Sequence, residues 1–204
     1  MNKLVLGVMA SGRGSNLQSI LDAIEKGTVP ARVSVVITDK PEAKALDRAR
    51  AAGIPAVCVN RKEYDSRESF EHALIEVLRA HGVELVVLAG FMRILTSVFV
   101  QAFKQRILNI HPSILPSFTG ADAHSLVLEY GAKVSGCTVH FVDEGMDTGP
   151  IILQATVPVM EDDDHDSLAA RVLVEEHKIY PEAIRLYAEG RLTIEGRKVR
   201  IDRN

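Results

Sequence analysis

An apolar run near 106–110 ends on Asn109 and His111 and is followed at once by Pro112. The run predicts a β-strand, and because side chains alternate along a strand, the amide and the imidazole project from the same face at its carboxyl end. An amide donor beside a titratable imidazole is the combination that stabilises and protonates a tetrahedral carbonyl adduct. We therefore expect a catalytic site here; the alternative is a strand-end cap beside an ordinary histidine.

A carboxylate that would orient His111 is available in the turn-prone segment 143–149. Asp147 lies there between two glycines, so by itself it is either a turn residue or that carboxylate. His124 and His140 either line the same cleft or are an ordinary helix residue and an ordinary strand residue. No arrangement of histidines and carboxylates has metal-site spacing, so we expect no metal. A GxSxG nucleophile elbow is also missing, which disfavours a serine nucleophile.

The first expected strand, near 3–9, leads into a glycine-rich stretch where a helix begins. The dinucleotide pattern GxGxxG fails because Leu17 occupies the third glycine position, and no GK[ST] completes a P-loop. What remains is either a phosphate cradle at Gly14, Ser15 and Asn16 or a plain turn capped by Ser15. Ligands bind beyond the carboxyl ends of parallel strands, and this position favours the cradle.

The segment 90–95 follows the continuously apolar stretch 85–89 and faces the same edge of the expected sheet. Its exposed backbone could read the edge of a flat heterocycle, with Ile94 and Leu95 as apolar walls; the alternative is ordinary packing of a loop. Arg93 is either a partner for a carboxylate or a solvated side chain.

Short apolar runs alternate with longer helical patterns in the first half of the chain. The expected strands lie near 3–9, 32–37, 56–59, 84–89 and 106–110. The expected helices lie near 15–27, 42–53, 66–81 and 96–103. This alternation predicts an α/β fold with a mostly parallel central sheet and helices on both faces.

The alternation of strand and helix patterns ends after His111. We expect a short helix near 123–131, then two β-prone runs, Gly136–Val142 and Pro150–Val159, joined by the turn that carries Asp147. The acidic run 161–164 precedes a long helix that begins near Asp166, and acids there are most simply a cap and a match to the helix dipole. Pro181 should kink or divide that helix. A small hairpin over 192–200 ends the chain.

Composition sets the broad class. The 204 residues carry a formal net charge of −3, so no basic field favours nucleic acid. The apolar start is too short for a membrane span and lacks signal-peptide anatomy, which predicts a cytoplasmic protein. Cys58 and Cys137 both fall in expected strands and are expected to be buried free thiols. We expect one domain over 1–204, with a nucleotide-binding-like half over 1–110 and a second half over 111–204.

Taken together, these segments resemble the formyltetrahydrofolate-dependent formyltransferases. The stretches that carry the resemblance cover nearly the whole chain in order: Gly14–Asn16, Val86–Leu95, Asn109–Pro116, His140–Pro150 and Glu176–Pro181. The Asn-Ile-His-Pro-Ser and Asp-Thr-Gly-Pro segments together are specific to this superfamily. Length and the cradle bring the chain nearest to the branch that acts on glycinamide ribonucleotide in purine biosynthesis.

The resemblance implies a Rossmann-like formyltransferase fold that transfers the formyl group of the cosubstrate 10-formyltetrahydrofolate to the primary amine of glycinamide ribonucleotide. It implies a monomer or a homodimer, with no metal, nucleic acid or membrane partner. The implied catalytic residues are Asn109, His111 and Asp147. The implied substrate-binding residues are Gly14, Ser15, Asn16, Met92, Pro112 and Glu176. The implied folate-binding residues are Arg93, Ile94, Leu95, Val142, Asp143, Glu144, Gly145, Met146 and Asp147.

The chain departs from the family pattern at two positions. Thr119 stands where a proline is common, so the loop after the histidine motif is expected to be less rigid. Leu173 stands where relatives often carry a glutamine three residues before the glutamate that matches Glu176, which puts part of the substrate site in doubt.

Three other functions stay open at this point. Formyltetrahydrofolate deformylases share the triad and transfer the formyl group to water, but they usually carry a preceding regulatory domain, which we do not expect because the first strand begins near residue 3. Methionyl-tRNA formyltransferases add a carboxyl-terminal RNA-binding domain, which we do not expect either. A non-catalytic nucleotide-binding module would keep the cradle but would not need Asn109, His111 and Asp147 together.

Overall fold

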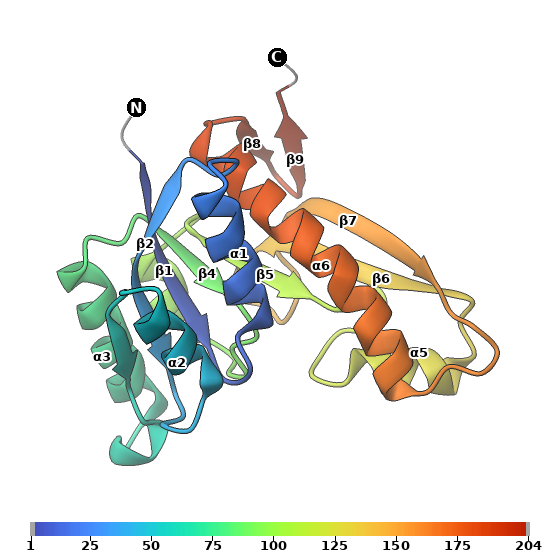
Figure 1. Ribbon diagram of the computed structural model, residues 1–204, viewed down its shortest axis with the longest axis horizontal. Coiled ribbons are helices and arrows are strands. Elements are labelled where there is room, and N and C mark those ends of the chain that lie inside the picture. Colours follow the sequence, from blue (N-terminus) through green and yellow to red (C-terminus); the bar gives the residue numbers. More distant parts are fainter. Residues whose placement is uncertain (1–2, 203–204) are drawn as a thin grey trace.

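The computed structural model describes residues 3–202, and a nine-stranded sheet runs through this part of the chain (Figure 1). The strand order is β3-β2-β1-β4-β5-β6-β7-β9-β8. The strands are β1 (Leu4–Ala10), β2 (Ala31–Thr38), β3 (Ala56–Cys58), β4 (Leu85–Leu88), β5 (Ile107–His111), β6 (Val134–Phe141), β7 (Ile151–Pro158), β8 (Leu192–Glu195) and β9 (Lys198–Ile201).

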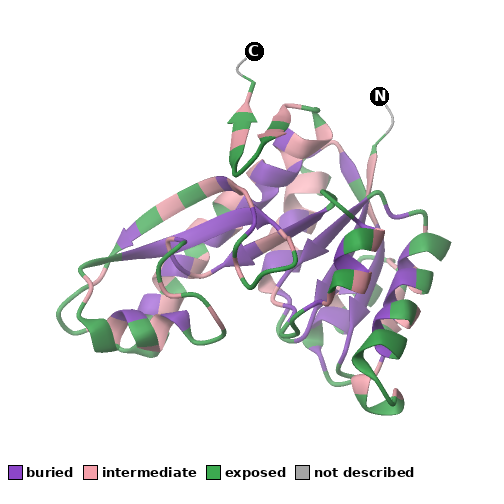
Figure 2. Cartoon of the chain, turned by 180° about the vertical axis from the view of Figure 1, so that it is seen from behind, coloured by how far each residue is buried: buried purple, intermediate pink, exposed green. Residues whose placement is uncertain are grey.

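Helices cover both faces of the sheet, as expected. One core joins the sheet to α1, α2, α5 and α6, and a second core on the other face joins it to α3 and α4. The helices are α1 (Ser15–Glu25), α2 (Lys44–Ala51), α3 (Arg67–Ala80), α4 (Ser97–Ala102), α5 (Ala123–Tyr130) and α6 (His165–Ala188), with a short 3₁₀ turn η1 (Arg61–Glu63). Figure 2 shows the central strands buried between these layers.

The two halves of the sheet differ in direction. Strands β1 to β5 are parallel, whereas β6 runs antiparallel to β5 and β7 runs antiparallel to β6. Both the parallel half and the antiparallel pair were expected. The order 3-2-1-4-5 in the parallel half reverses direction between β1 and β4, and in such sheets ligands bind beyond the strand ends at this reversal.

Three local expectations need correction. Cys58 is exposed, while Cys137 is buried as expected, because β3 is a three-residue strand at the edge of the sheet. Pro181 does not divide the long helix: α6 runs unbroken through it. Ser15 does not cap α1; the capping position is Gly14, with left-handed φ 70°, and Ser15 is the first helical residue.

The long helix has the acidic cap that the sequence predicts, one residue earlier than expected. The Asp164 carboxylate accepts the backbone N–H of Ser167 at 2.8 Å and completes a capping box. None of the described helices is long and apolar enough to cross a membrane.

Candidate active site

A cavity of about 470 Å³ lies at the carboxyl ends of β4 and β5, where the parallel and antiparallel halves meet. This volume is in the range of sites that hold a drug-sized molecule. Its lining residues are Leu88, Gly90, Phe91, Met92, Arg93, Ile94, Leu95, Asn109, Ile110, His111, Pro112, Gly120, Ala121, His140, Val142, Asp143, Gly145, Met146 and Asp147.

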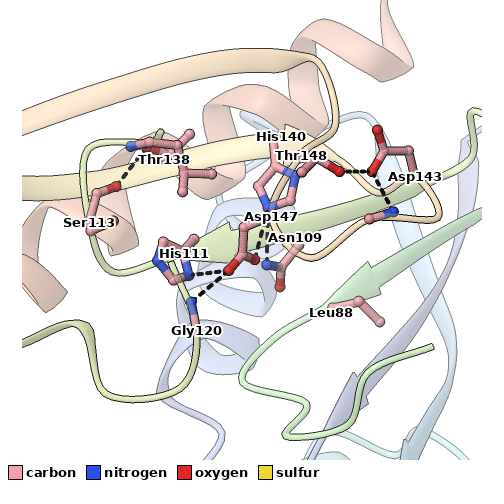
Figure 3. Close-up of polar contacts among 12 residues, drawn as sticks. Leu88, Asn109, His111, Ser113, Gly120, Thr138, His140, Asp143, Asp147 and Thr148 are labelled. Carbon is pink, nitrogen blue, oxygen red and sulfur yellow. Dashed lines mark hydrogen bonds and ion pairs between the residues drawn. The ribbon is translucent and has the colours of Figure 1, made fainter. Parts of the chain in front are cut away.

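Asn109 and His111 both line this cavity, together with Ile110 between them. The antiparallel register places Asn109 directly opposite His140 of β6 and His111 opposite Thr138. Opposed residues of an antiparallel pair project from the same face, so the register adds His140 to the cavity. Figure 3 shows Asn109, His111 and His140 gathered around Asp147, with Thr138 farther away beside Ser113.

The hydrogen bonds of His140 define its tautomer. Its Nδ1 lies 2.8 Å from the carbonyl oxygen of Phe141, which can only accept, so Nδ1 carries the proton. The unprotonated Nε2 then accepts from the side-chain amide of Asn109 at 3.2 Å. Burial lowers the pKa of His140, and the hydrogen bond to the Phe141 carbonyl and the nearby carboxylate of Asp147 oppose this only in part. His140 is thus a neutral acceptor that holds the amide of Asn109 in one orientation.

Asp147 contacts both histidines from the turn between β6 and β7. One carboxylate oxygen lies 3.5 Å from Nδ1 of His111 and accepts the backbone N–H of Gly120 at 3.0 Å. The other lies 3.8 Å from Nε2 of His140. Asp147 adopts φ 55°, a left-handed conformation that is uncommon for a residue with a side chain. The turn therefore holds this carboxylate against the strand ends.

Local contacts hold the turn itself. The Asp143 carboxylate accepts from the Thr148 hydroxyl at 2.6 Å and from the backbone N–H of Gly145 at 3.1 Å. At Gly149 a Cβ atom would lie 1.7 Å from the carbonyl oxygen of Phe141, so only glycine fits where the turn closes onto β6.

The imidazole of His111 is 4% exposed and lies between two oxygen acceptors. Its Nε2 donates to the carbonyl oxygen of Phe118 at 2.9 Å, and its Nδ1 faces Asp147. A neutral imidazole can donate from one nitrogen only, whereas an imidazolium donates from both. Each ring nitrogen of His111 thus faces an oxygen acceptor.

The expected folate-binding residues form two walls of the cavity, with one exception. Residues 92–95 line it from the segment after β4, and Val142, Asp143, Gly145, Met146 and Asp147 line it from the turn after β6. Glu144 is outside the lining, and its carboxylate accepts from the side-chain amide of Gln101 on α4 at 2.5 Å. Pro112, expected beside the amine substrate, also lines the cavity.

The cradle residues lie outside the cavity lining and form a second group with Glu176. The side-chain amide of Asn16 donates to the buried Glu176 carboxylate at 2.7 Å, across α1 and α6. Burial raises the pKa of Glu176, and the Asn16 hydrogen bond opposes that rise. The loop that carries the cradle meets the cavity wall through Ser11, whose backbone N–H donates to the carbonyl oxygen of Gly90 at 3.0 Å.

The structure separates the two histidines that the sequence left open. His140 belongs to the site, and the feature that would have revealed it is the β5–β6 register, which places it opposite Asn109. His124 lies on α5 with its ring centroid 5.4 Å from that of His165, outside the cavity lining. Among residues 3–202, no group of three or more His, Cys, Asp or Glu side chains has the arrangement of a metal site.

The model of one protein family, described as Formyl transferase, matches residues 4–184. The chain belongs to the formyl transferase family. It is 45% identical over 185 residues to the phosphoribosylglycinamide formyltransferase of Escherichia coli (strain K12), covering 91% of this chain and 87% of that protein. It is 46% identical over 193 residues to the trifunctional purine biosynthetic protein adenosine-3 of Gallus gallus, covering 95% of this chain but only 19% of that longer protein.

The fold agrees with that of solved formyl transferases. The crystal structure of glycinamide ribonucleotide transformylase 1 from Symbiobacterium toebii superposes with a TM-score of 0.97 at 56% identity and covers 98% of this chain and 94% of that one. A phosphoribosylglycinamide formyltransferase structure from Coxiella burnetii gives a TM-score of 0.93 at 39% identity, with coverage of 98% and 94%. The formyl transferase fold expected from the sequence is confirmed.

Proposed function

We propose that this formyl transferase transfers the formyl group of 10-formyltetrahydrofolate to the primary amine of glycinamide ribonucleotide in purine biosynthesis. The observation that carries the proposal is the convergence of Asn109, His111 and Asp147 at one end of a cavity large enough for a folate. The names of the relatives at 45% and 56% identity support the choice of amine.

The proposed reaction is a direct displacement. The amine attacks the formyl carbon, and the carbonyl oxygen becomes an oxyanion that the Asn109 amide stabilises by a hydrogen bond and the charged His111 stabilises by its positive charge. Asp147 keeps His111 charged and, directly or through water, helps move a proton from the attacking nitrogen to the departing N10. The tetrahedral adduct then collapses to the formamide and tetrahydrofolate, and no bond forms between the substrate and the protein.

Two physical effects share the rate enhancement. An oxyanion donor contributes roughly 3–4 kcal/mol in comparable sites. Holding the amine and the formyl donor in contact contributes on the order of 7–11 kcal/mol. Positioning is the larger effect, so both binding sites must converge on the three catalytic residues.

The two groups of residues in the structure suit the two substrates. The cavity walls at 92–95 and 142–147 would take the folate. The free amides at the start of α1, at Gly14, Ser15 and Asn16, would bind the phosphate of the amine, with Glu176 on its ribose. Met92 and Pro112 would lie beside the reacting amine. The Leu173 side chain has no polar group, so it cannot add a hydrogen bond to the substrate beside Glu176.

We further propose that the two halves, 1–110 and 111–204, form a single formyltransferase domain, because one continuous sheet crosses their junction at β5 and β6. The oligomeric state, monomer or homodimer, stays a prediction.

The test is to mix the protein with 10-formyltetrahydrofolate, with and without glycinamide ribonucleotide, and follow loss of the formyl donor. The proposal expects turnover only when the amine is present. Formate release without the amine would replace it with a deformylase, and no turnover in either case would leave a binding module.

A further inference from the structure

The segment Gly90–Thr96, which forms one wall of the cavity, has an unusual kind of support. It contains no helix or strand. Among the described residues, no main-chain group of residues 91–95 forms a hydrogen bond with another main-chain group. A wall that offers its backbone to a heterocycle must leave those groups free, so other groups have to hold it in place.

Three shielded polar side chains from three separate elements supply that support. The Ser11 hydroxyl, after β1, accepts the backbone N–H of Met92 at 2.9 Å. The Asp39 carboxylate, after β2, accepts from Nε of Arg93 at 2.6 Å. The Glu71 carboxylate, on α3, accepts the backbone N–H of Thr96 at 2.8 Å and also the Thr96 hydroxyl.

The burial of the two carboxylates shows that these contacts are specific. Asp39 is 3% exposed and Glu71 is 1% exposed. Removing a carboxylate from water is costly unless it is hydrogen-bonded. Both oxygens of Glu71 accept from Thr96, whereas Asp39 accepts through one oxygen, from Arg93, and its other oxygen is buried without a hydrogen bond. Asp39 thus ties the wall at Arg93, and Glu71 ties it at Thr96, to the body of the protein.

The support also explains how apolar side chains stay exposed on the wall. Phe91 and Leu95 are buried in the core beneath α3 and α4, whereas Met92 is 69% exposed and Ile94 is 57% exposed. Free apolar side chains on an unanchored loop would collapse onto the core. The polar contacts at Met92, Arg93 and Thr96 hold the intervening residues outward, toward the cavity.

We propose that Asp39 and Glu71 are positioning residues for folate binding: they hold the Gly90–Thr96 wall, through Arg93 and Thr96, in the shape that accepts the folate heterocycle. The inference rests on the proposed function for the identity of the ligand. It assigns neither residue a contact with the substrate or a part in the chemistry.

The ligand test measures the Kd of tetrahydrofolate and the KM values of both substrates in Asp39→Ala and Glu71→Leu. Loss of one hydrogen bond to a charged group corresponds to a change of roughly tenfold or more. We expect the Kd of tetrahydrofolate and the KM of the formyl donor to rise by that factor, with kcat at saturation and the KM of the amine little changed. Glu71→Gln keeps an acceptor for the Thr96 N–H and should restore most of the affinity.

The matched control is Asp163→Ala. Asp163 is also shielded and also pairs with an arginine at 2.6 Å, Arg171, but this pair lies at the start of α6 and outside the cavity lining. Asp163→Ala should lower the melting temperature without changing the Kd of tetrahydrofolate. If Glu71→Leu does not fold, the test uses Asp39→Ala and Glu71→Gln instead.

A ligand-free measurement separates this inference from the proposed function. Hydrogen exchange of the amides of residues 91–96 should speed up in Asp39→Ala and Glu71→Leu and stay unchanged in Asp163→Ala. Unchanged exchange in folded variants would overturn the positioning role, as would a Kd equal to that of the unmodified chain. If the unmodified chain neither binds tetrahydrofolate nor consumes the formyl donor, the proposed function fails while the exchange result still decides the role of Asp39 and Glu71.

Discussion

The proposed catalytic corner (Asn109, His111, His140 and Asp147) and the proposed phosphate cradle (Gly14, Ser15 and Asn16) are built in opposite ways. In the corner, side chains contact side chains across two strands and a turn, and each contact needs a particular functional group. In the cradle, the groups proposed to bind phosphate are backbone amides at the start of α1, and Gly14 supplies the left-handed turn before them. Loss of a side chain should therefore stop chemistry in the corner, whereas only added charge or bulk should disturb the cradle.

Removing the imidazole should have the largest effect. His111→Ala should lower kcat by roughly 10³-fold, because it removes the positive charge beside the developing oxyanion and leaves Asp147 without its imidazole partner. Steady-state rates at saturating substrates measure this. His124→Ala, a histidine outside the cavity, is the matched control and should keep its kcat. Near-normal transfer by the His111 variant would show that the corner does not carry out the chemistry.

Neutralising the carboxylate should have the next largest effect. Asp147→Asn keeps an acceptor for the N–H of Gly120 and tolerates the left-handed backbone, so it isolates the charge that faces His111. We expect kcat to fall roughly 100-fold with little change in the melting temperature.

Asp143→Asn is the comparison variant for the loss of the Asp147 charge. Asp143 holds the same turn but does not contact His111, so its variant should raise the KM of the formyl donor more than it lowers kcat. Equal losses of kcat in the two variants would mean that turn geometry, and not the Asp147 charge, controls the rate.

At the cradle, an added charge should change binding alone. Ser15→Asp places a carboxylate beside a phosphate dianion, and the repulsion should raise the KM of the amine by on the order of tenfold while the KM of the formyl donor stays nearly constant. Ser15→Asn, neutral and of similar size, is the control. An unchanged KM for the amine in Ser15→Asp would remove the cradle from the substrate site.

The smallest effect concerns stability. Burial raises the pKa of Glu176 above 4.5, so the folded chain holds this proton more tightly than the unfolded chain does. The free energy of unfolding should therefore fall as pH rises from 4.5 through the raised pKa of the folded state. Glu176→Gln cannot titrate and should lack this part of the decline. Urea unfolding of both proteins across this pH range measures it, and parallel profiles would contradict the assignment.

The sequence predicts most of what lies in the parallel half. Asn109 and His111 share a face because strand periodicity is local, and the segment after β4 reaches the same edge because parallel strands end together. The α/β class, the antiparallel pair and the long helix follow from the same alternation of patterns.

What the sequence misses depends on register and burial. His140 enters the site because the β5–β6 register opposes it to Asn109, and the long connection between these two strands leaves that register open in the sequence. Asp39 and Glu71 look like ordinary charged residues because only the packed fold shows that they are buried. Cys58 looks like a core thiol until its strand proves to be the edge of the sheet.

The destination of the formyl carbon tests the central claim most directly. Glycinamide ribonucleotide and 10-formyltetrahydrofolate labelled with ¹³C at the formyl carbon would be mixed with the protein and followed by carbon NMR. Direct transfer at the catalytic corner predicts that the label appears in the formamide of the ribonucleotide, with none in formate beyond the protein-free rate, and that His111→Ala abolishes the signal. Label that collects in formate, or a formamide signal that survives in His111→Ala, would contradict the account.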